Sequence, residues 1–274
     1  MLGIRTSIIL GSFAVLSTGL PGSVLAAPPE DLSRWTAIRA EVYGDKPMSD
    51  GAGIIELDSP KRAEEAASVP VTIKALVPQT KDKYISKLTL IVDENPVPVV
   101  ATFLTGPANG NATIGTRIRV NDFSYIHVVG EMNDGQLVVV SKYIKSIGGC
   151  SAQPLSDQEA AKDRLGKMTL KQPDPVGLGE PSQFTFTLGH PNNSGLQFDQ
   201  ITRLYIPAHY ITTTEITFEG QPVLTVKPNI SIAEDPTFTF SYVVEKAGEM
   251  KVHMEDSKHG VYDKSYRVVP GAGS

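Results

Sequence analysis

Two neighbouring runs of β-branched and aromatic residues, at positions 125–144, constrain the fold of this chain most strongly. They flank an Asn-Asp-Gly turn at 133–135, and such a turn between two runs of this kind is a strong signal for a β-hairpin. Runs of period two also occur at 71–77, 85–92 and 97–104. Because alternating side chains point to opposite faces of a strand, these runs predict an antiparallel sandwich in the first half of the chain.

The second half of the chain has the same strand-rich pattern. A hairpin is expected at 211–226 around Glu219 and Gly220. The remaining expected strands are 184–188, 237–244, 250–255 and 261–269. Together they predict a second small sandwich, and the fold class is therefore all-β.

Only short helices are expected. Leu32, Trp35, Ile38 and Val42 recur at helical spacing, and Gly44 can end a helix that begins near residue 27. Between the halves, a capping box at 156–159 precedes a short apolar stretch, which predicts a linker helix.

The first residues form an export signal. Arg5 precedes a short apolar run, and Val24-Leu25-Ala26 is a typical cleavage sequence. Residues 1–26 are thus expected to be a signal peptide that is removed on export to the periplasm, because the run is too short to span a bilayer. The formal net charge of −5 argues against nucleic acid or an anionic membrane as a partner.

Cys150 is the single cysteine of the chain. It cannot form an internal disulfide, so in an oxidising compartment it is buried, bonded to another molecule or chemically used. Gly148 and Gly149 precede it and Ser151 follows. Glycines permit backbone angles that are closed to other residues, so we expect Gly148 and Gly149 to give a flexible arm that exposes the thiol. No basic residue adjoins the cysteine in sequence, so no local device for lowering its pKa is visible.

The Gly-Gly-Cys sequence at 148–150 resembles the carboxyl-terminal motif of SoxY, one subunit of the sulfur-oxidation carrier SoxYZ. Asn95-Pro96-Val97-Pro98 and Thr116-Arg117-Ile118-Arg119 also resemble SoxY segments, and three segments of the second half are similar to SoxZ: 190–195, 206–211 and 231–240. The chain thus resembles a fused SoxYZ of the type associated with quinoprotein dehydrogenases.

This resemblance implies two immunoglobulin-like antiparallel β-sandwiches. The implied domains are a SoxY-like sandwich at 27–150, a linker at 151–178 and a SoxZ-like sandwich at 179–274. It also implies a non-catalytic carrier, without cofactor, that holds a sulfur intermediate such as one derived from thiosulfate on Cys150. The implied partners are periplasmic redox enzymes: a haem protein that attaches the substrate, a hydrolase and a dehydrogenase.

The chain differs from the family pattern after the cysteine. The family's arm ends almost at the carboxyl terminus, whereas here it continues through Ser151 and Ala152. The arm is therefore tethered at both ends and can protrude only as a loop, which needs a wider partner entrance.

Other readings remain open. The five histidines are dispersed in sequence, so no metal site is expected, and His190 and His209 are expected to support inter-domain packing or turns. The chain could instead be an accessory module of a periplasmic quinoprotein dehydrogenase in which Cys150 carries nothing. A thiol enzyme is disfavoured because no base or second cysteine adjoins Cys150. An accessible thiol could also form an intermolecular disulfide.

Overall fold

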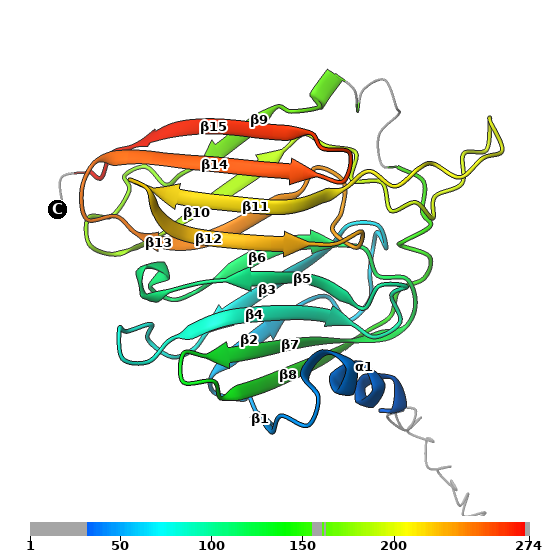
Figure 1. Ribbon diagram of the computed structural model, residues 1–274, viewed down its shortest axis with the longest axis horizontal. Coiled ribbons are helices and arrows are strands. Elements are labelled where there is room, and N and C mark those ends of the chain that lie inside the picture. The colour runs from blue at the N-terminus through cyan, green and yellow to red at the C-terminus, as the bar shows by residue number, and fades with distance from the viewer. Residues whose placement is uncertain (1–31, 155–160, 162, 272–274) are drawn as a thin grey trace, which may run out of the picture. The chain divides into compact units, whose positions relative to one another are not determined.

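The structure is a computed structural model that describes residues 32–154, 161 and 163–271. It confirms the all-β prediction, because nearly all of the regular structure in the described residues consists of strands in two facing sheets (Figure 1). The expected signal peptide at 1–26 lies outside the described residues. No helix in the described part is long and apolar enough to cross a membrane.

The first half of the chain begins with a helix, α1 (Ser33–Tyr43), which Gly44 ends with a positive φ of 62°. Its strands are β1 (Met48–Asp50), β2 (Ile55–Asp58), β3 (Val69–Ala75), β4 (Ile85–Val92), β5 (Val99–Leu104), β6 (Ile114–Ile118), β7 (Ser124–Met132) and β8 (Leu137–Ile144). A single 3₁₀ turn, Pro107–Asn109, links β5 to β6.

The second half contains seven strands among its described residues. They are β9 (Met168–Lys171), β10 (Pro181–Leu188), β11 (Ile211–Phe218), β12 (Gln221–Pro228), β13 (Thr237–Val243), β14 (Gly248–Asp256) and β15 (Val261–Val268). β9 falls within the expected linker and pairs with β10. Most of the expected linker helix lies outside the described residues, although Ala161, Asp163 and Arg164 are helical.

Both predicted hairpins are confirmed. β7 pairs with β8 from Glu131 opposite Leu137 to Ser124 opposite Ile144. β11 pairs with β12 across Glu219 and Gly220, whose φ angles are both positive, at 49° and 77°. Positive φ at both central residues fits the right-handed twist of the flanking strands, which is why glycine occurs there.

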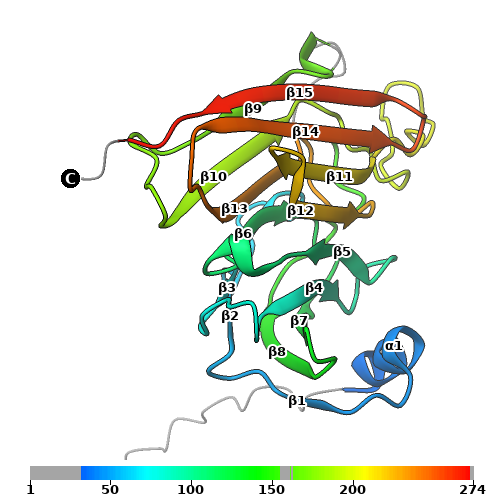
Figure 2. The ribbon, with the colours of Figure 1, turned by 60° about the vertical axis from the view of Figure 1, so that its left-hand side comes forward.

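The two halves share both of their sheets. One sheet has the order β1-β8-β7-β4-β5-β12-β11-β14-β15, and the other has the order β2-β3-β6-β13-β10-β9. The halves therefore meet where β5 pairs with β12 and where β6 pairs with β13, as Figure 2 shows. We call this boundary the seam. The two predicted sandwiches are joined edge to edge rather than through a separate interface.

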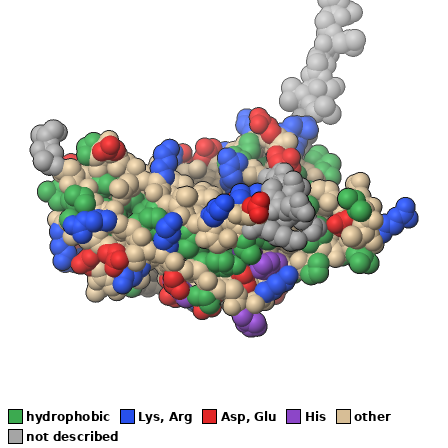
Figure 3. Space-filling model, turned by 90° about the horizontal axis from the view of Figure 1, so that it is seen from above, with side chains coloured by type: hydrophobic (Ala, Val, Ile, Leu, Met, Phe, Trp, Pro, Cys, Tyr) green, Lys and Arg blue, Asp and Glu red, His purple; other side chains and the backbone are tan. Residues whose placement is uncertain are grey.

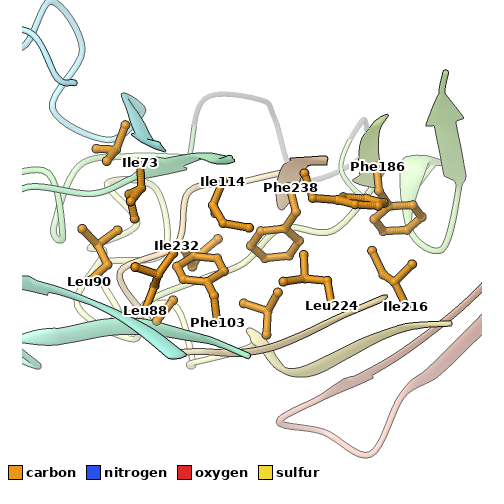
Figure 4. Close-up of a cluster of buried hydrophobic side chains, with 14 of the residues drawn as sticks. Ile73, Leu88, Leu90, Phe103, Ile114, Phe186, Ile216, Leu224, Ile232 and Phe238 are labelled. Atoms are coloured by element: carbon orange, nitrogen blue, oxygen red, sulfur yellow. The ribbon is translucent and has the colours of Figure 1, made fainter. Parts of the chain in front are cut away.

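The hydrophobic core continues across the seam. Figure 4 shows Phe103 of the first half beside Phe238 of the second, and their ring centroids lie 6.3 Å apart in an edge-to-face arrangement. Ile114 and Ile232 complete the contact from the two sides and are also fully buried. Since close-packed apolar side chains provide most of the stabilisation of folding, the two halves stabilise each other.

Helix α1 packs against the outer face of the larger sheet. Ile38 and Tyr43 are buried against Ile91 and Val129. Trp35 stacks on the ring of His127 at a centroid distance of 4.0 Å. The predicted helix is therefore held by tertiary contacts, as expected for a helix of this length.

Candidate functional site

Cys150 lies in a short segment, residues 147–153, that follows β8 and its extension. We call it the cysteine segment. Gly149 donates a backbone hydrogen bond to Val120 O at 3.1 Å, and Gly148 donates one to Asn121 O. These bonds fasten the segment to the stretch that follows β6, on the first-half side of the seam.

The structure gives the two glycines a role different from flexibility. A Cβ atom on Gly149 would lie 2.1 Å from the carbonyl oxygen of Ala66 and 2.6 Å from that of Val120. Gly149 is therefore needed for a close backbone approach. Gly148 has a φ of 75°, in the left-handed region that glycine adopts without strain. The expectation that Gly148 and Gly149 form a mobile arm does not hold in this structure.

The expectation of an exposed thiol is also wrong for this structure, in which Cys150 has no solvent exposure. Groups from the second half complete its enclosure. Ser194 Oγ donates a hydrogen bond to the carbonyl oxygen of Cys150 at 2.6 Å, while Ile147 and Ser151 on either side remain exposed. The segment is thus at the surface, and only its centre is covered.

The surroundings of the thiol are polar. Ser231 forms a hydrogen bond with the Cys150 side chain, and the Arg119 guanidinium acts on it through its charge. Burial raises the pKa of the Cys150 thiol, and these two groups offset part of the effect. A thiol in this position is neutral and protected at neutral pH, and it becomes nucleophilic only when it is uncovered.

Arg119 is a buried cation at the seam. Its side chain is 1% exposed. Nη1 donates to Gly149 O and Nη2 to Asn192 O, both at the long distance of 3.4 Å, and Nε has no hydrogen-bond partner. Burial lowers the pKa of Arg119, and the charges that oppose this shift are, in decreasing order, Cys150, Glu234 and Glu65.

Sequence reasoning missed Arg119 because it lies 31 positions before the cysteine and because adjacent charged residues are usually exposed. The alternation of residue types along Ile114 to Val120 is the one relevant signal. Buried positions alternate as far as Ile118, and Arg117 is exposed as this pattern requires. Arg119 then continues the polar phase but is buried, because the strand has ended and the chain turns into the seam.

A second buried polar cluster lies within the second half. His209 Nε2 is 2.8 Å from Asp256 Oδ2 and 3.2 Å from His190 Nε2. Tyr262 donates its hydroxyl hydrogen to Asp256 Oδ2 at 2.8 Å. We call these four residues the histidine cluster. The histidines that are dispersed in sequence thus converge in space, at distances that a metal ion could bridge.

The hydrogen bonds of His190 argue against a metal ion in the histidine cluster. The Asn192 backbone N–H donates to His190 Nδ1 at 3.0 Å, so the ring proton of the neutral imidazole is on Nε2. A metal bound at Nε2 would require that proton on Nδ1 instead, where Asn192 would oppose it. Burial, followed by the charge of His209, lowers the pKa of His190 to about 4, and hydrogen bonds outweigh burial in lowering the pKa of Asp256.

A pocket of about 520 Å³ lies beside the histidine cluster in the second half. Its walls include Leu204, Tyr205, Ile206 and Pro207, with His209 at its polar side. The adjacent loop at 196–206, which projects at the right of Figure 1, exposes large apolar side chains, Ile201 above all at 94%.

Charged side chains of both signs are interspersed on the face shown in Figure 3. Charges that alternate in this way do not form the basic stripe that nucleic-acid binding needs. This agrees with the acidic net charge of the chain.

The chain matches two family models in tandem. The model described as "Sulfur oxidation protein SoxY" matches residues 39–150, and the model described as "Sulphur oxidation protein SoxZ" matches residues 171–267. The first match ends at Cys150. A search of curated proteins found no match.

Several solved structures are similar to this chain at low identity, over shares that range from about a third to more than four fifths of it. The sulfur carrier protein SoxY from Chlorobium limicola f thiosulfatophilum is 24% identical, with a TM-score of 0.35, and the match covers 41% of this chain and 91% of that one. A superoxide reductase (neelaredoxin) from Ignicoccus hospitalis is 12% identical, with a TM-score of 0.31, and the match covers 34% and 79%. At these scores the likenesses add no argument about function.

Proposed function

The chain joins a SoxY region to a SoxZ region and is a fused SoxYZ-like protein of the sulfur-oxidation carrier family, and on this premise we propose that it carries a sulfur intermediate covalently on Cys150. Proteins of this family are non-catalytic carriers, and the chain is accordingly not an enzyme. Its task would be to present the intermediate to partner redox enzymes in the periplasm.

One observation carries the proposal: the match to SoxY ends at the only cysteine of the chain. That cysteine is fully buried at the seam, next to Ser231 and Arg119, and it is not a member of the large apolar cluster that joins the two sheets. A buried cysteine with a purely structural role usually lies among apolar side chains. A hydroxyl and a guanidinium beside the sulfur instead favour a chemically used thiol.

The proposed attachment step is an oxidation. With thiosulfate as the substrate, a bond forms between Cys150 Sγ and the terminal sulfur. The thiol loses one proton, and two electrons pass to the haem-containing partner that catalyses the coupling. The bond is an ordinary disulfide-type linkage, which a later partner can cleave by attack of a thiolate or by reduction.

The cysteine segment lies in a position, which we call its seat, that is formed by residues 120–121 and Ser194. Because Cys150 is covered there, the sulfur intermediate can be attached only after the segment leaves its seat. Among the described residues, the bonds to be broken are two backbone bonds to 120–121, the Ser194 hydroxyl bond and the long Arg119 contact. The Ser231 bond to the thiol and the bond that the Gln153 side chain donates to Phe198 O would also break. The apolar loop at 196–206 begins beside the covering residues. Its exposed Ile201, Leu204 and Tyr205 provide a surface that a partner could bind while it uncovers the thiol.

Intact-mass and peptide analysis of protein from its native host, isolated without reductant, tests the proposal. Under sulfur-oxidising growth the Cys150 peptide should carry an added sulfur species. A Cys150→Ser variant should then lose the corresponding growth phenotype. The control for the exact position of the thiol is Cys150→Ser combined with Ser151→Cys, which moves the thiol by one residue. If Cys150 is unmodified under every sulfur source, the carrier proposal fails.

The burial of Cys150 favours a second candidate function. In this alternative the chain is an accessory module for a periplasmic quinoprotein dehydrogenase, and Cys150 only fills space at the seam. Cys150→Ser, which keeps the size and the hydrogen bond to Ser231, would then leave the phenotype unchanged. Loss of the phenotype with unchanged thermal stability would exclude this candidate.

Export is part of the proposal. Removal of residues 1–26 would place Ala27 at the amino terminus of the mature protein. Amino-terminal sequencing of the periplasmic fraction should find Ala27, whereas an intact Met1 in the cytoplasm would contradict the proposed location.

A further inference from the structure

The starting observation is a buried positive charge without a matching negative one. Arg119 is 1% exposed, and no carboxylate oxygen of the described residues lies within 4.0 Å of its guanidinium nitrogens. Glu234, one of the two acids that act on it at longer range, is paired with Arg164 at 2.7 Å. Glu65, the other, accepts a hydrogen bond from the Ala67 backbone.

The guanidinium also has spare donors. Of its five N–H groups, Nε–H is buried and has no acceptor, and the two acceptors that Nη1 and Nη2 reach are carbonyl oxygens at 3.4 Å. Burying a cation costs several kcal/mol unless it is paired. A guanidinium forms strong charge-assisted hydrogen bonds with anions, so an anion bound beside Arg119 would compensate its buried charge.

The group whose negative charge would act most strongly on Arg119 is Cys150. Arg119 Nη1 already contacts the carbonyl oxygen of the neighbouring Gly149. In the free protein the thiol is neutral, so the cation has no counter-ion. An anionic group on the sulfur would provide one.

We infer that Arg119 is a positioning residue that binds the negative charge of an adduct on Cys150 and so holds the loaded cysteine segment in its seat at the seam. The inference rests on the proposed function for the presence of an adduct in the cell. It adds that the seat distinguishes adducts by charge, because an anionic adduct satisfies Arg119 and a neutral one leaves it unpaired.

The inference is tested with adducts made chemically on the full chain without its signal peptide. Tetrathionate converts the Cys150 thiolate to an S-thiosulfonate and releases thiosulfate. Methyl methanethiosulfonate gives a neutral methyl disulfide and releases methanesulfinate. Both reactions are run in mild urea, because the thiol is covered, and the products are refolded and verified by intact mass.

The readout is protection from cleavage by dithiothreitol. For each adduct, the cleavage rate in the urea-unfolded protein is divided by the rate in the folded protein, which cancels the intrinsic reactivity of the adduct. We expect the anionic adduct to be protected at least about tenfold more than the neutral one, as charge-assisted hydrogen bonds to a buried Arg require. Equal protection, or better protection of the neutral adduct, overturns the inference.

Arg119→Gln should abolish this difference between the adducts. Arg117→Gln is the matched control, because Arg117 lies two positions away but is exposed and bonds to Ser68; it should keep the difference. If Arg119→Gln does not fold, Arg119→Lys keeps the charge and should retain part of the difference. A difference that persists in Arg119→Gln would overturn the inference. The carrier proposal is judged separately, on the modification of Cys150 in the native host.

Discussion

The surroundings of Cys150 and Arg119 at the seam and the histidine cluster are both buried and polar, yet their hydrogen bonding differs. In the histidine cluster, Asp256 accepts bonds from Tyr262, His209 and the backbone of Lys258 and Gly260. At the seam, Arg119 has a donor with no acceptor. A cluster whose central carboxylate accepts four hydrogen bonds stabilises one structure, whereas a cluster with an unmet donor is suited to a ligand or to a change of state.

The largest expected effect concerns the seat of the cysteine segment. Gly149→Ala would place a methyl group within 2.1 Å of a backbone oxygen, and we expect it to lower the free energy of unfolding by about 4 kcal/mol or to expel the segment. Urea unfolding and the rate of reaction with Ellman's reagent distinguish the two results. Gly148→Asn should lower the free energy of unfolding far less, because asparagine tolerates a positive φ. Equal effects of the two variants would show that residue 149 is not closely packed against Ala66.

A pair of charge removals tests the contrast directly. Asp256→Asn should destabilise the unmodified protein by about 3 kcal/mol, because the negative charge is lost and two of the four donors would face an amide NH₂ group in place of an acceptor. Arg119→Met should be neutral or stabilising in the absence of an adduct, since an unpaired buried charge is replaced by an apolar side chain. Chemical unfolding at pH 7 measures both. A loss for Arg119→Met as large as that for Asp256→Asn would mean that the seam is as fully bonded as the histidine cluster.

The histidine cluster predicts a pH dependence of stability. The pKa of His190 is lowered from an ordinary 6.5 to about 4 in the folded protein, so between these values the unfolded chain binds the proton first. Stability should therefore fall on acidification, by about 2 kcal/mol between pH 7 and pH 4.5. His190→Asn keeps an acceptor for Asn192 and should remove most of this fall. His259→Asn, at an exposed turn, is the control and should retain it.

The smallest effect is expected for the hydroxyl bond that helps to enclose the cysteine. Ser194→Ala removes the 2.6 Å bond to Cys150 O, at a cost of about 1 kcal/mol. The thiol should then react about fivefold faster with Ellman's reagent, because the covered state is less favoured. Ser151→Ala, an exposed serine of the same segment, should leave the rate unchanged. An unchanged rate in Ser194→Ala would place the barrier to exposure elsewhere.

The strands could be predicted from sequence because each depends on neighbouring residues. The alternation within β7 and β8 and the turn residues between them determine a local structure. The pairing of β5 with β12 could not be predicted in this way. It joins residues more than one hundred positions apart, such as Ala101 and Pro228, and neither strand carries a local mark of its partner.

The candidate site follows from the sequence in part. Cys150 is a candidate because it is unique and follows two glycines, but two glycines in sequence predict mobility, which the structure does not have at this place. The alternative role of Gly149, a close approach to Ala66, depends on a backbone 83 residues away. Arg119 and the convergence of His190 with Asp256 depend on contacts of the same long-range kind, which composition and spacing do not reveal.

The shared sheets limit how the protein can move. To hinge at the seam, the ladder between β5 and β12 and the ladder between β6 and β13 would have to break together, along with the ring contact of Phe103 and Phe238. The two halves therefore do not move against each other as rigid bodies. On the proposed carrier function, a sulfur intermediate on Cys150 would be exchanged through local opening of the few residues around it. The rate of exchange would then be insensitive to the length of the connection between the halves.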